Sequence, residues 1–381
     1  MKINRKEFLS LSGMSLFGFS MFNSLTGCGN VTPNRQIKGS GKAMIEIKTK
    51  RLNLAHTWTI SRNSSDYKDN VFVKIEKDGI VGYGEAAPNV RYGENSELTT
   101  EKLQDAKSIF DEHDLFHYTD IKEALDAKIL KQSCAKAAFD IALMDWIGKA
   151  FNLPLYKMYG LNISKTPVTS FSIGIDTPEV IRQKVEEAKD YPILKIKVGK
   201  KNDEEIIGAV RSVTDKTIRV DANEGWKSKE EALEKINWLK TQGVEFIEQP
   251  MPADMIKETA WLRERVEMPI VADEAVKNAA DIPMLSTAYD GINIKLMKSG
   301  GMQEAMRMIQ MAKALKMKIM LGCMIESSIA ISAAAHLAPY VDWADLDGNL
   351  LIKNDPFTGV KVDKGKFVFN DKPGLGVEGD F

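Results

Sequence analysis

This sequence of 381 residues contains little cysteine and histidine and has no excess of either charge. It has three cysteines, four histidines, 52 lysines and arginines, and 53 aspartates and glutamates. Three thiols cannot build a disulfide scaffold, and no two histidines have the HxH or HExxH spacing of a histidine-rich zinc site. The balanced charge excludes the basic stripe of a nucleic-acid-binding protein. With 44% hydrophobic residues, the chain can fold on an apolar core as two domains, or as one large barrel with an addition.

The N-terminus has the layout of an export signal. Three basic side chains within the first six residues precede an apolar run, residues 8–25, that is interrupted by serines. The run is short for a membrane span, so we interpret it as a signal rather than a transmembrane anchor. Residues 4–9 resemble a twin-arginine signal with Lys6 in place of the second arginine, which leaves the export route open.

The LTGC segment at 25–28 follows directly and resembles the lipobox of bacterial lipoproteins, in which the cysteine receives the lipid. On this resemblance we expect a lipoprotein signal peptide over 1–28 and an exported protein that a lipid holds to a bacterial membrane, facing the periplasm. Residues 29–43 are rich in Gly, Asn, Pro and Ser and predict a flexible tether. The remaining cysteines, Cys134 and Cys323, have apolar sequence neighbours and are interpreted as core thiols.

The segment 44–165 predicts an α+β domain. Apolar and polar residues alternate over 44–47 and 71–76, as in strands, and the second run ends at the turn pair Asp78-Gly79. Three helical segments follow, over roughly 99–112, 119–130 and 132–150. The third is apolar on most of its circumference and is expected to be buried. Strands followed by helices are typical of an α+β fold.

The segment 166–350 has a different pattern, in which short apolar runs alternate with amphipathic, helix-like stretches. Eight such runs occur at a spacing of about 22–27 residues. They are 168–173, 194–198, 218–220, 246–247, 270–272, 291–295, 318–321 and 343–346. Eight strand–helix alternations predict a (β/α)8-type barrel, for which the first domain serves as an N-terminal α+β cap. Residues 351–381 regain turn and strand character and are expected to return to the cap.

Acidic residues end three consecutive predicted barrel strands, and the active site of such a barrel is built from its C-terminal strand ends. They are Asp221, Glu248 and Asp273. One carboxylate per neighbouring strand places three hard oxygen ligands around one point, which suits Mg²⁺. Because an acid after an apolar run is often only a helix cap, the prediction depends on all three occurring together at barrel spacing.

Lysines flank the three acids. Lys195 and Lys197 lie on the strand before them and Lys295 on the strand after them. Residues two apart on a strand face the same way, so Lys195 and Lys197 can both point into the barrel. A neighbouring ammonium disfavours the charged form of a lysine, so we expect a lysine here that can serve as a base. A KxK pattern alone is more often a solvated strand face.

With these motifs the sequence resembles the enolase superfamily, in its muconate-lactonizing-enzyme subgroup, from about Met44 to the end of the chain. The GYGEAAP segment at 82–88 is similar to the signature of that family's first domain. Segments 138–145 and 154–156 are similar to its buried helix and the turn that follows. The KxK, DAN, EQP and DE motifs and the last lysine occur in the same order as the family's site motifs.

The resemblance implies a role for each of these residues. It implies that one Mg²⁺ per subunit is bound by Asp221, Glu248 and Asp273. It also implies that Lys197 and Lys295 are the two acid/base residues and that Lys195 supports Lys197.

Within that subgroup the closer resemblance is to dipeptide epimerases, of which L-Ala-D/L-Glu epimerase is one. Asp345-Leu346-Asp347 is similar to a DxD motif whose acids hold the free α-ammonium of a dipeptide, and segments 293–301 and 324–327 also resemble that family. The alternative for Asp345 and Asp347 is a pairing with lysines or a turn cap. Arg62, in the loop after the first strand, can bind a substrate carboxylate through its bidentate fork. A surface position is the alternative for Arg62.

The resemblance implies an isomerase that acts on a small dipeptide by 1,1-proton transfer. One lysine removes the α-proton of the second residue, Mg²⁺ holds the charge of the enediolate, and the other lysine returns a proton to the opposite face. An o-succinylbenzoate synthase or cycloisomerase is the alternative enzyme, and an inactive exported binding lipoprotein is the alternative outside catalysis. No nucleic-acid partner is expected, contact with the membrane is through the lipid anchor only, and a homo-oligomer stays open.

Overall fold

A three-stranded antiparallel sheet opens the part of the chain that the computed structural model describes, residues 41–381. Its strands are β1 (Met44–Thr59), β2 (Ser64–Lys77) and β3 (Ile80–Ala86), in that spatial order. Asp78 and Gly79 join β2 to β3 with φ angles of 54° and 73°, and a two-residue type I′ hairpin turn requires positive φ at both positions. The expected signal peptide and all but the end of the expected tether lie outside the described residues.

The buried helix of the cap packs directly on this sheet. It is α5 (Ser133–Ala150), and most of its side chains are buried, as its all-round apolar sequence predicts. Two glycines of the GYGEAAP segment allow the close approach, because a Cβ on Gly82 or Gly84 would lie 2.1 or 1.9 Å from a backbone carbonyl oxygen of α5. A side chain at either position would therefore push the helix off the sheet.

The other cap helices are short. They are α2 (Ser96–Ala106), α3 (Ile109–Glu112), α4 (Tyr118–Lys128) and α6 (Leu155–Met158), with the 3₁₀ helices η1 (Val90–Tyr92) and η2 (Ile163–Lys165). The single helix expected over 99–112 is wrong, because the structure divides it between α2 and α3. Buried Leu103, Ala106 and Ile109 keep a helical spacing across the break, so the apolar pattern alone does not reveal it.

Eight parallel strands form the second sheet, in which each strand pairs with its neighbours in the chain. They are β4 (Phe171–Ile173), β5 (Ile193–Lys197), β6 (Thr217–Asp221), β7 (Val244–Glu248), β8 (Ile270–Ala272), β9 (Gly291–Lys295), β10 (Lys318–Gly322) and β11 (Trp343–Asp345). A bridge between Thr169 and Ala344 joins the two ends of the sheet, and the Ser170 amide donates to the Ala344 carbonyl at 3.1 Å. The strands fall on the eight predicted runs, so the (β/α)8-type barrel with an N-terminal α+β cap is confirmed.

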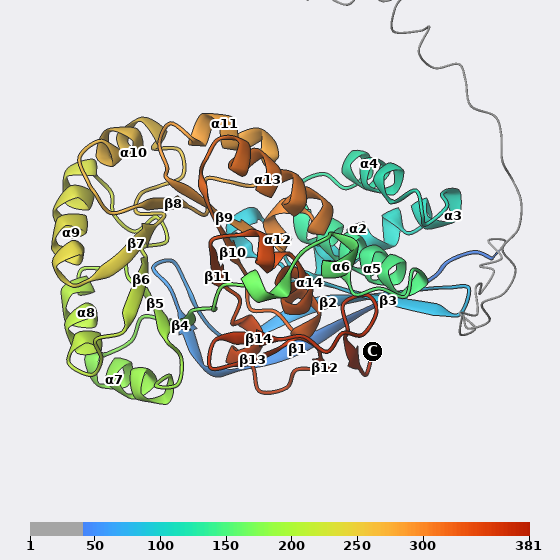
Figure 1. The fold of residues 1–381 in the computed structure, drawn as a ribbon, viewed down its shortest axis with the longest axis horizontal. Helices are drawn as coiled ribbons and strands as arrows, with labels where there is room; N and C mark the ends of the chain where they lie inside the picture. Colours follow the sequence, from blue (N-terminus) through green and yellow to red (C-terminus); the bar gives the residue numbers. More distant parts are fainter. Residues whose placement is uncertain (1–40) are drawn as a thin grey trace, which may run out of the picture. The chain divides into compact units, whose positions relative to one another are not determined.

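Helices alternate with these strands and cover the outside of the barrel (Figure 1). They are α7 (Pro178–Glu187), α8 (Asp203–Arg211), α9 (Lys229–Thr241), α10 (Ile256–Arg263), α11 (Ile282–Leu285), α12 (Leu296–Ser299), α13 (Met302–Ala314) and α14 (Ser328–Leu337), with η3 (Ala279–Asp281), η4 (Ala338–Tyr340) and η5 (Gly348–Leu351). Local sequence fixes their starts. In α7, the Thr177 side chain accepts from the Val180 amide and Pro178 opens the helix, both of which favour helix initiation. Among residues 41–381, no helix is long and apolar enough to cross a bilayer.

The C-terminal segment contacts the cap strands. It contains β12 (Phe357–Thr358), β13 (Lys361–Asp363), β14 (Lys366–Val368) and β15 (Glu378–Gly379), paired as β12–β15 and β13–β14. Ile352 forms a β-bridge with Leu54 of β1, and the Phe357 ring stacks on Phe72 of β2 with ring centroids 5.9 Å apart. The Lys48 amino group donates to the Phe381 carbonyl at 3.0 Å.

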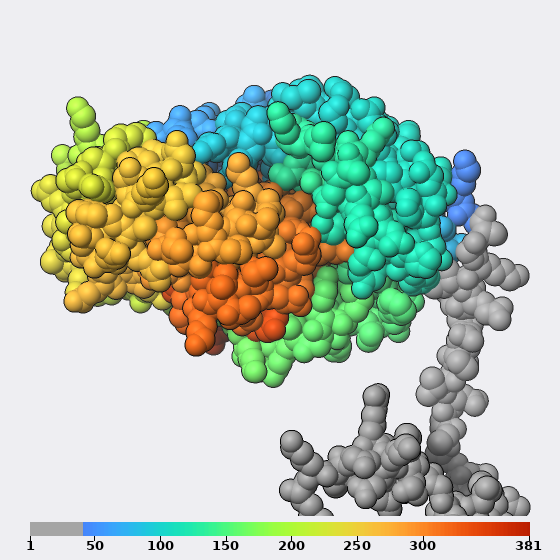
Figure 2. Space-filling view, turned by 90° about the horizontal axis from the view of Figure 1, so that it is seen from above, coloured from blue at the N-terminus to red at the C-terminus, as the bar shows by residue number. Residues whose placement is uncertain are grey.

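The cap lies over the C-terminal ends of the barrel strands. Asn70 of β2 donates to the Ile325 carbonyl, just past β10, at 3.0 Å, and the Ser327 amide donates to Glu85 of β3 at 2.8 Å. Figure 2 shows the cap surface, in blue to teal, against barrel segments in yellow and orange. The strand ends that carry the predicted site residues therefore face a second wall made by the cap.

Candidate active site

Three carboxylates meet at the C-terminal end of the barrel. Asp221 and Glu248 are the last residues of β6 and β7 and pair in register, and Asp273 directly follows β8. One oxygen of each lies within 4.8 Å of an oxygen of the other two, and all three residues are buried. The structure thus brings together the three acids that the sequence predicts as neighbours.

This group of acids fits a divalent cation. Burial and the neighbouring Asp221 carboxylate raise the pKa of Glu248 to about 8, because crowded like charges disfavour ionisation. Glu248 Oε1 accepts from Asn293 at 2.7 Å. The other oxygen, Oε2, is buried and has no hydrogen bond among residues 41–381. The Lys195 amino group lies 2.6 Å from Oε2 and forms an ion pair with it. A hard cation would use that oxygen and remove the repulsion, and three carboxylates are the ligand type that Mg²⁺ prefers.

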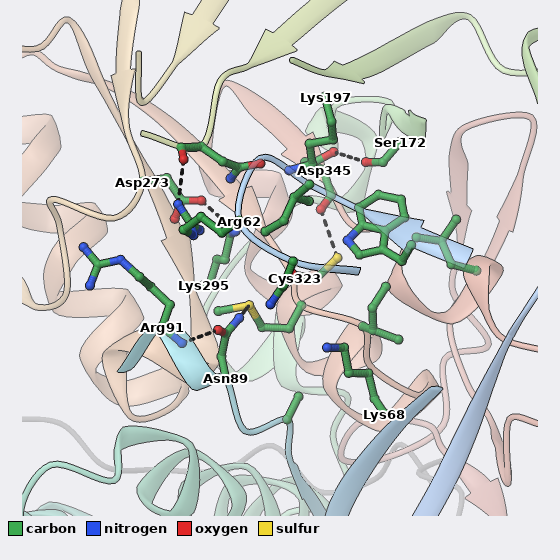
Figure 3. Close-up of a pocket in the computed structure, with 18 of the residues that line it drawn as sticks. Arg62, Lys68, Asn89, Arg91, Ser172, Lys197, Asp273, Lys295, Cys323 and Asp345 are labelled. Atoms are coloured by element: carbon green, nitrogen blue, oxygen red, sulfur yellow. Dashed lines mark hydrogen bonds and ion pairs between the residues drawn. The ribbon is translucent and has the colours of Figure 1, made fainter. Parts of the chain in front are cut away.

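Two lysines flank the acids from opposite sides. Lys197 ends β5 and Lys295 ends β9, so the three acid-bearing strands β6, β7 and β8 lie between them. The Lys197 amino group is 2.6 Å from Asp221 Oδ2, and that of Lys295 is 2.7 Å from Asp273 Oδ2. Both line the same cavity, and Figure 3 shows them at different sides of it.

The Lys195 ammonium does lower the pKa of Lys295, as expected of a neighbouring positive charge, but nearby carboxylates raise the pKa of Lys295 and Lys195 overall. Burial disfavours the charge on Lys295, but the Asp273 and Glu248 carboxylates outweigh burial and raise its pKa. Burial also disfavours the charge on Lys195, but the neighbouring carboxylates, Asp345 most strongly, outweigh burial and raise the pKa of Lys195. Sequence reasoning counted the ammonium groups and underestimated how closely the carboxylates approach them.

Lys195 lies inside the charge network rather than at its edge. Its amino group is 2.6 Å from Glu248 Oε2, 2.6 Å from Asp345 Oδ2 and 3.4 Å from Asp221 Oδ2, and the side chain is only 1% exposed. A fully buried ammonium between three carboxylates holds them in fixed positions. Lys195 and Lys197 both pair with Asp221 Oδ2, and the supporting role of Lys195 that the resemblance implies stays a prediction.

Asp345, the last residue of β11, and Asp347, two residues later, have different surroundings. Asp345 pairs with Lys195 and accepts from the Ser170 hydroxyl at 2.6 Å, and although burial opposes ionisation, Lys195 lowers the pKa of Asp345 to about 2. Asp347 accepts from the Ser172 amide at 2.6 Å, and no ion pair to it exists within residues 41–381. Burial and the Asp345 carboxylate raise the pKa of Asp347 to about 7. Asp347 is therefore the acid that is available to an arriving cation.

Arg62 extends from the cap over the barrel mouth, as Figure 3 shows. Its guanidinium donates to the Asn223 carbonyl at 2.7 Å, to Glu224 at 2.9 Å and to Glu274 at 2.6 Å. Arg91 also donates to Glu224, at 2.8 Å to each carboxylate oxygen. Arg62 thus reaches the site, and its donors there are engaged by acids of the barrel loops.

Backbone strain marks the same loops. Asn223, Glu224 and Gln249 have φ angles of 45°, 65° and 36°, which side chains other than glycine rarely adopt. Gln249 directly follows Glu248 at the end of β7, and Asn223 and Glu224 lie two and three residues after Asp221 at the end of β6. Such strain persists only where the surrounding structure holds it, and it is typical of functional sites.

The comparisons with known proteins agree with this geometry. Residues 43–160 match the family model of the mandelate racemase / muconate lactonizing enzyme N-terminal domain, and residues 179–381 match that of the enolase C-terminal domain-like family. The chain belongs to the mandelate racemase / muconate lactonizing enzyme family of the enolase superfamily. The predicted family and the predicted enzyme class, an isomerase, are confirmed by these matches and by the named relatives.

Within this family, the chain is similar to one epimerase by sequence and to two epimerases of solved structure. The L-Ala-D/L-Glu epimerase of Bacteroides thetaiotaomicron is 44% identical over 379 residues, which cover 98% of this chain and 99% of that protein. A substrate-liganded complex of the L-Ala-D/L-Glu epimerase from Bacillus subtilis has a TM-score of 0.85 at 30% identity and covers 89% of this chain and 99% of its own. The dipeptide epimerase of Enterococcus faecalis, complexed with Mg and L-Leu-L-Tyr, has a TM-score of 0.84 at 32% identity, with coverages of 88% and 99%.

Sequence reasoning missed Lys298, which contacts one acid of the carboxylate triad, and misjudged the surroundings of Cys323. The Lys298 amino group contacts both Asp273 Oδ1 and the Asp273 carbonyl, the latter at 2.5 Å. Lys298 follows Lys295 by one turn of α12, so a helical spacing would have placed both at the same acid. Cys323, interpreted as a core thiol, instead lines the cavity, with its sulfur 3.2 Å from the Asp345 carbonyl oxygen.

Proposed function

We propose that this protein is a dipeptide epimerase that inverts the α-carbon of the second residue, with L-Ala-D/L-Glu as its preferred dipeptide. The observation that carries the proposal is the pair of lysines, Lys197 and Lys295, on opposite sides of one carboxylate triad. Two acid/base groups that face a single carbon from both sides suit inversion. The epimerase names of relatives that cover almost the whole chain support the same activity.

The charges of the site fit the two ends of a dipeptide. Asp347 is unpaired and receives the α-ammonium through a charge-assisted hydrogen bond. Asp221, Glu248 and Asp273 hold Mg²⁺, which supplies positive charge to the substrate's carboxylate as the α-proton leaves. A dianionic substrate of a cycloisomerase or an o-succinylbenzoate synthase would have no use for Asp347, and a binding lipoprotein would have none for two opposed lysines.

The two lysines act as a matched acid and base. One amino group, in its neutral form, accepts the α-proton, and the bond electrons remain on the substrate. The other, in its ammonium form, donates a proton to the opposite face of the same carbon, which inverts it. In the reverse direction the two exchange roles, so each lysine serves one epimer. Lys195 fixes the positions of Glu248 and Asp345 throughout.

The activity is tested by incubating the Mg²⁺-loaded protein with a dipeptide library in D₂O and measuring deuterium at the α-carbon by mass spectrometry. We expect exchange and inversion at the second residue of free dipeptides, with L-Ala-L-Glu among the best. N-acetylated dipeptides should react about ten- to a hundredfold less well, since they lack the charge that Asp347 binds.

The Asp347→Asn variant is the control for that comparison. Without the carboxylate, the advantage of free over N-acetylated dipeptides should shrink, with most of the loss on the free substrate. Equal losses on both would assign Asp347 a structural role. Absence of exchange with every dipeptide would contradict the proposed function itself.

We also propose that the protein is exported and held to a bacterial membrane by a lipid on Cys28, facing the periplasm. The lipobox-like LTGC segment after a basic and apolar leader supports this. The wild-type protein should incorporate labelled fatty acid and sediment with membranes, because several acyl chains bind a bilayer firmly. Cys28→Ser should remove the label and shift the protein out of the membrane fraction, and the activity of the purified variant should remain unchanged. Wild-type protein that stays unlabelled in the cytoplasm, with residues 1–27 attached, would contradict the proposal.

A further inference from the structure

A second cavity lies beside the active-site cavity and is lined by basic residues. It has a volume of about 490 Å³ and lies where loops of the cap meet loops of the barrel. Arg91 and Tyr92 line both cavities, so the two are neighbours. Within residues 41–381, no acidic residue lines this second one, the basic cavity. The basic residues that line it are Arg91, Lys131, Lys136, Lys277 and Lys298.

Acids outside the basic cavity compensate three of these five cations only in part. Each acid contacts its cavity cation and, at the same time, a second cation that does not line the cavity. A carboxylate that is shared between two cations carries one negative charge for both, so it compensates the cavity cation less than a dedicated partner would. The three groups are Glu224 with Arg91 and Arg62, Asp126 with Lys136 and Lys122, and Asp273 with Lys298 and Lys295.

The other two cations, Lys131 and Lys277, form no ion pair in the part of the chain that the structure describes, and both are exposed. They come from opposite walls of the basic cavity. Lys131 lies between α4 and α5 of the cap, and Lys277 lies between β8 and η3 of the barrel. Local contacts hold both loops, because the Gln132 side chain donates to the Gly93 carbonyl at 3.2 Å and the Lys277 amide donates to Asp281 at 2.8 Å. The cavity therefore presents one unpaired ammonium from each domain.

Two acids close to these loops bind backbone and side-chain donors and do not line the basic cavity. Asp281 accepts from two backbone amides of its own loop, at 2.8 and 3.1 Å. Glu94 accepts from the Ser133 hydroxyl and from the Cys134 amide, each at 3.1 Å. Among the described residues, neither acid forms an ion pair with the two unpaired lysines, so an excess of positive charge remains at the cavity.

We infer that the basic cavity binds a small multivalent oxyanion of the phosphate class, held between Lys131 of the cap and Lys277 of the barrel. Ammonium groups are common phosphate ligands, and hydrogen bonds between oppositely charged groups are the strong ones. An anion also relieves the repulsion that crowded cations exert on one another. The Asn278 side chain lines the same cavity, and its NH₂ group can donate a further hydrogen bond. This binding site is separate from the reaction at the triad and goes beyond the proposed epimerase activity.

The position of the basic cavity favours a free ion over the headgroup of a membrane lipid. A free phosphate that enters between the cap and the barrel can contact both walls at once, whereas the phosphates of a bilayer lie in a broad layer. Because one contact comes from each domain, the bound ion ties the cap to the barrel. Occupancy of the site should therefore stabilise the folded protein, as does any ligand that binds only the folded state.

The test is a titration of the purified protein with inorganic phosphate at constant ionic strength, followed by ³¹P NMR and by the melting temperature. We expect saturable binding of one phosphate per chain and a melting temperature that rises with occupancy. Binding should persist without Mg²⁺, because none of the three triad acids lines the basic cavity. Absence of saturable binding would overturn the inference, and so would a requirement for Mg²⁺, which would place the phosphate at the metal.

Lys131→Gln and Lys277→Gln should each weaken phosphate binding about tenfold, the effect of one lost charge-assisted hydrogen bond. The double variant should show no saturable binding. In phosphate-free buffer the double variant should melt at the wild-type temperature or above it, because it removes charges that repel their neighbours. A lower melting temperature there would assign the two lysines a structural role and overturn the inference.

The matched control is the double variant Lys361→Gln/Lys366→Gln, which removes two exposed lysines of the β13–β14 hairpin, outside the basic cavity. It changes the net charge by the same amount and should bind phosphate like the wild type. Equal weakening in both double variants would show a general effect of charge and overturn the inference.

Two further results would overturn the inference by placing the anion elsewhere. Binding that is lost in Lys197→Ala but kept in the Lys131 and Lys277 variants would place the phosphate in the active-site cavity, which Lys197 lines. Binding to phosphatidylglycerol vesicles without binding to inorganic phosphate would identify a surface for lipid rather than a cavity for a free ion. Binding of inorganic phosphate that is lost only in the Lys131 and Lys277 variants supports the site.

Discussion

Lys197→Ala and Lys295→Ala should each abolish epimerisation, with a loss of at least about a hundred- to ten-thousandfold, the usual contribution of a positioned acid or base. The physical reason is that inversion needs a proton removed on one face and delivered on the other. Each variant keeps one amino group, so each should still exchange the α-proton of one epimer with D₂O. The two variants should retain exchange with opposite epimers. The measurement is the deuterium content of separately prepared L,L and L,D substrates after incubation.

The matched control is Lys257→Ala, which removes an exposed lysine of α10 and should behave like the wild type. Retention of exchange with the same epimer in both active-site variants would show that the two lysines do not serve opposite faces. Inversion at the wild-type rate in either variant would remove that lysine from the mechanism.

Glu248→Gln should lower activity by at least about a hundredfold, the scale on which the loss of one electrostatic stabiliser affects catalysis. Of the three triad acids, Glu248 is the one with a buried oxygen that lacks a hydrogen bond, and replacing it by an amide removes a charge from the predicted Mg²⁺ site without changing its shape. Titration calorimetry should show weaker Mg²⁺ binding. Chelation of the wild-type protein should abolish activity, and added Mg²⁺ should restore it.

Glu248 is a sharper choice than Asp273 for this experiment. Asp273 also contacts the buried Lys298, and its replacement would leave that ammonium without a carboxylate, which is strongly destabilising. Glu234→Gln, an exposed acid on α9, is the control and should bind Mg²⁺ like the wild type. Full activity of the chelated protein, or unchanged Mg²⁺ affinity in Glu248→Gln, would contradict the metal site.

The strand ends were predictable from the sequence, because the carboxyl ends of neighbouring parallel strands meet on one side of a barrel. This geometry alone brings Asp221, Glu248 and Asp273 together, and it places Lys197 and Lys295 on either side. The same barrel geometry predicts the position of any residue that ends a strand. It does not predict the position of Lys298, which lies one helical turn beyond the end of β9.

Pairing between loops was beyond sequence reasoning. The partners of Arg62 follow β6 and β8 and lie 162 and 212 residues further along the chain, and no local pattern connects them. Sequence alone therefore cannot show that the charge of Arg62 is already engaged by acids of the barrel loops. Asp345 and Asp347 present the same problem, since their i, i+2 spacing suggests equivalence, but β11 ends at Asp345 and only that acid meets Lys195.

The contact between β1 and the C-terminal segment has a consequence for the order in which the molecule assembles. Lys48 and Phe381 are separated by 333 residues, so a chain produced from its N-terminus makes β1 long before the segment that covers it. Closing so long a loop lowers the entropy of the chain before any stabilising contact forms, and contacts between residues so far apart in the sequence slow folding. Until the last strand arrives, the buried Leu52 and Leu54 of β1 lack part of their final surroundings. Completion of the cap is thus a late event of synthesis, after the barrel residues have all been made.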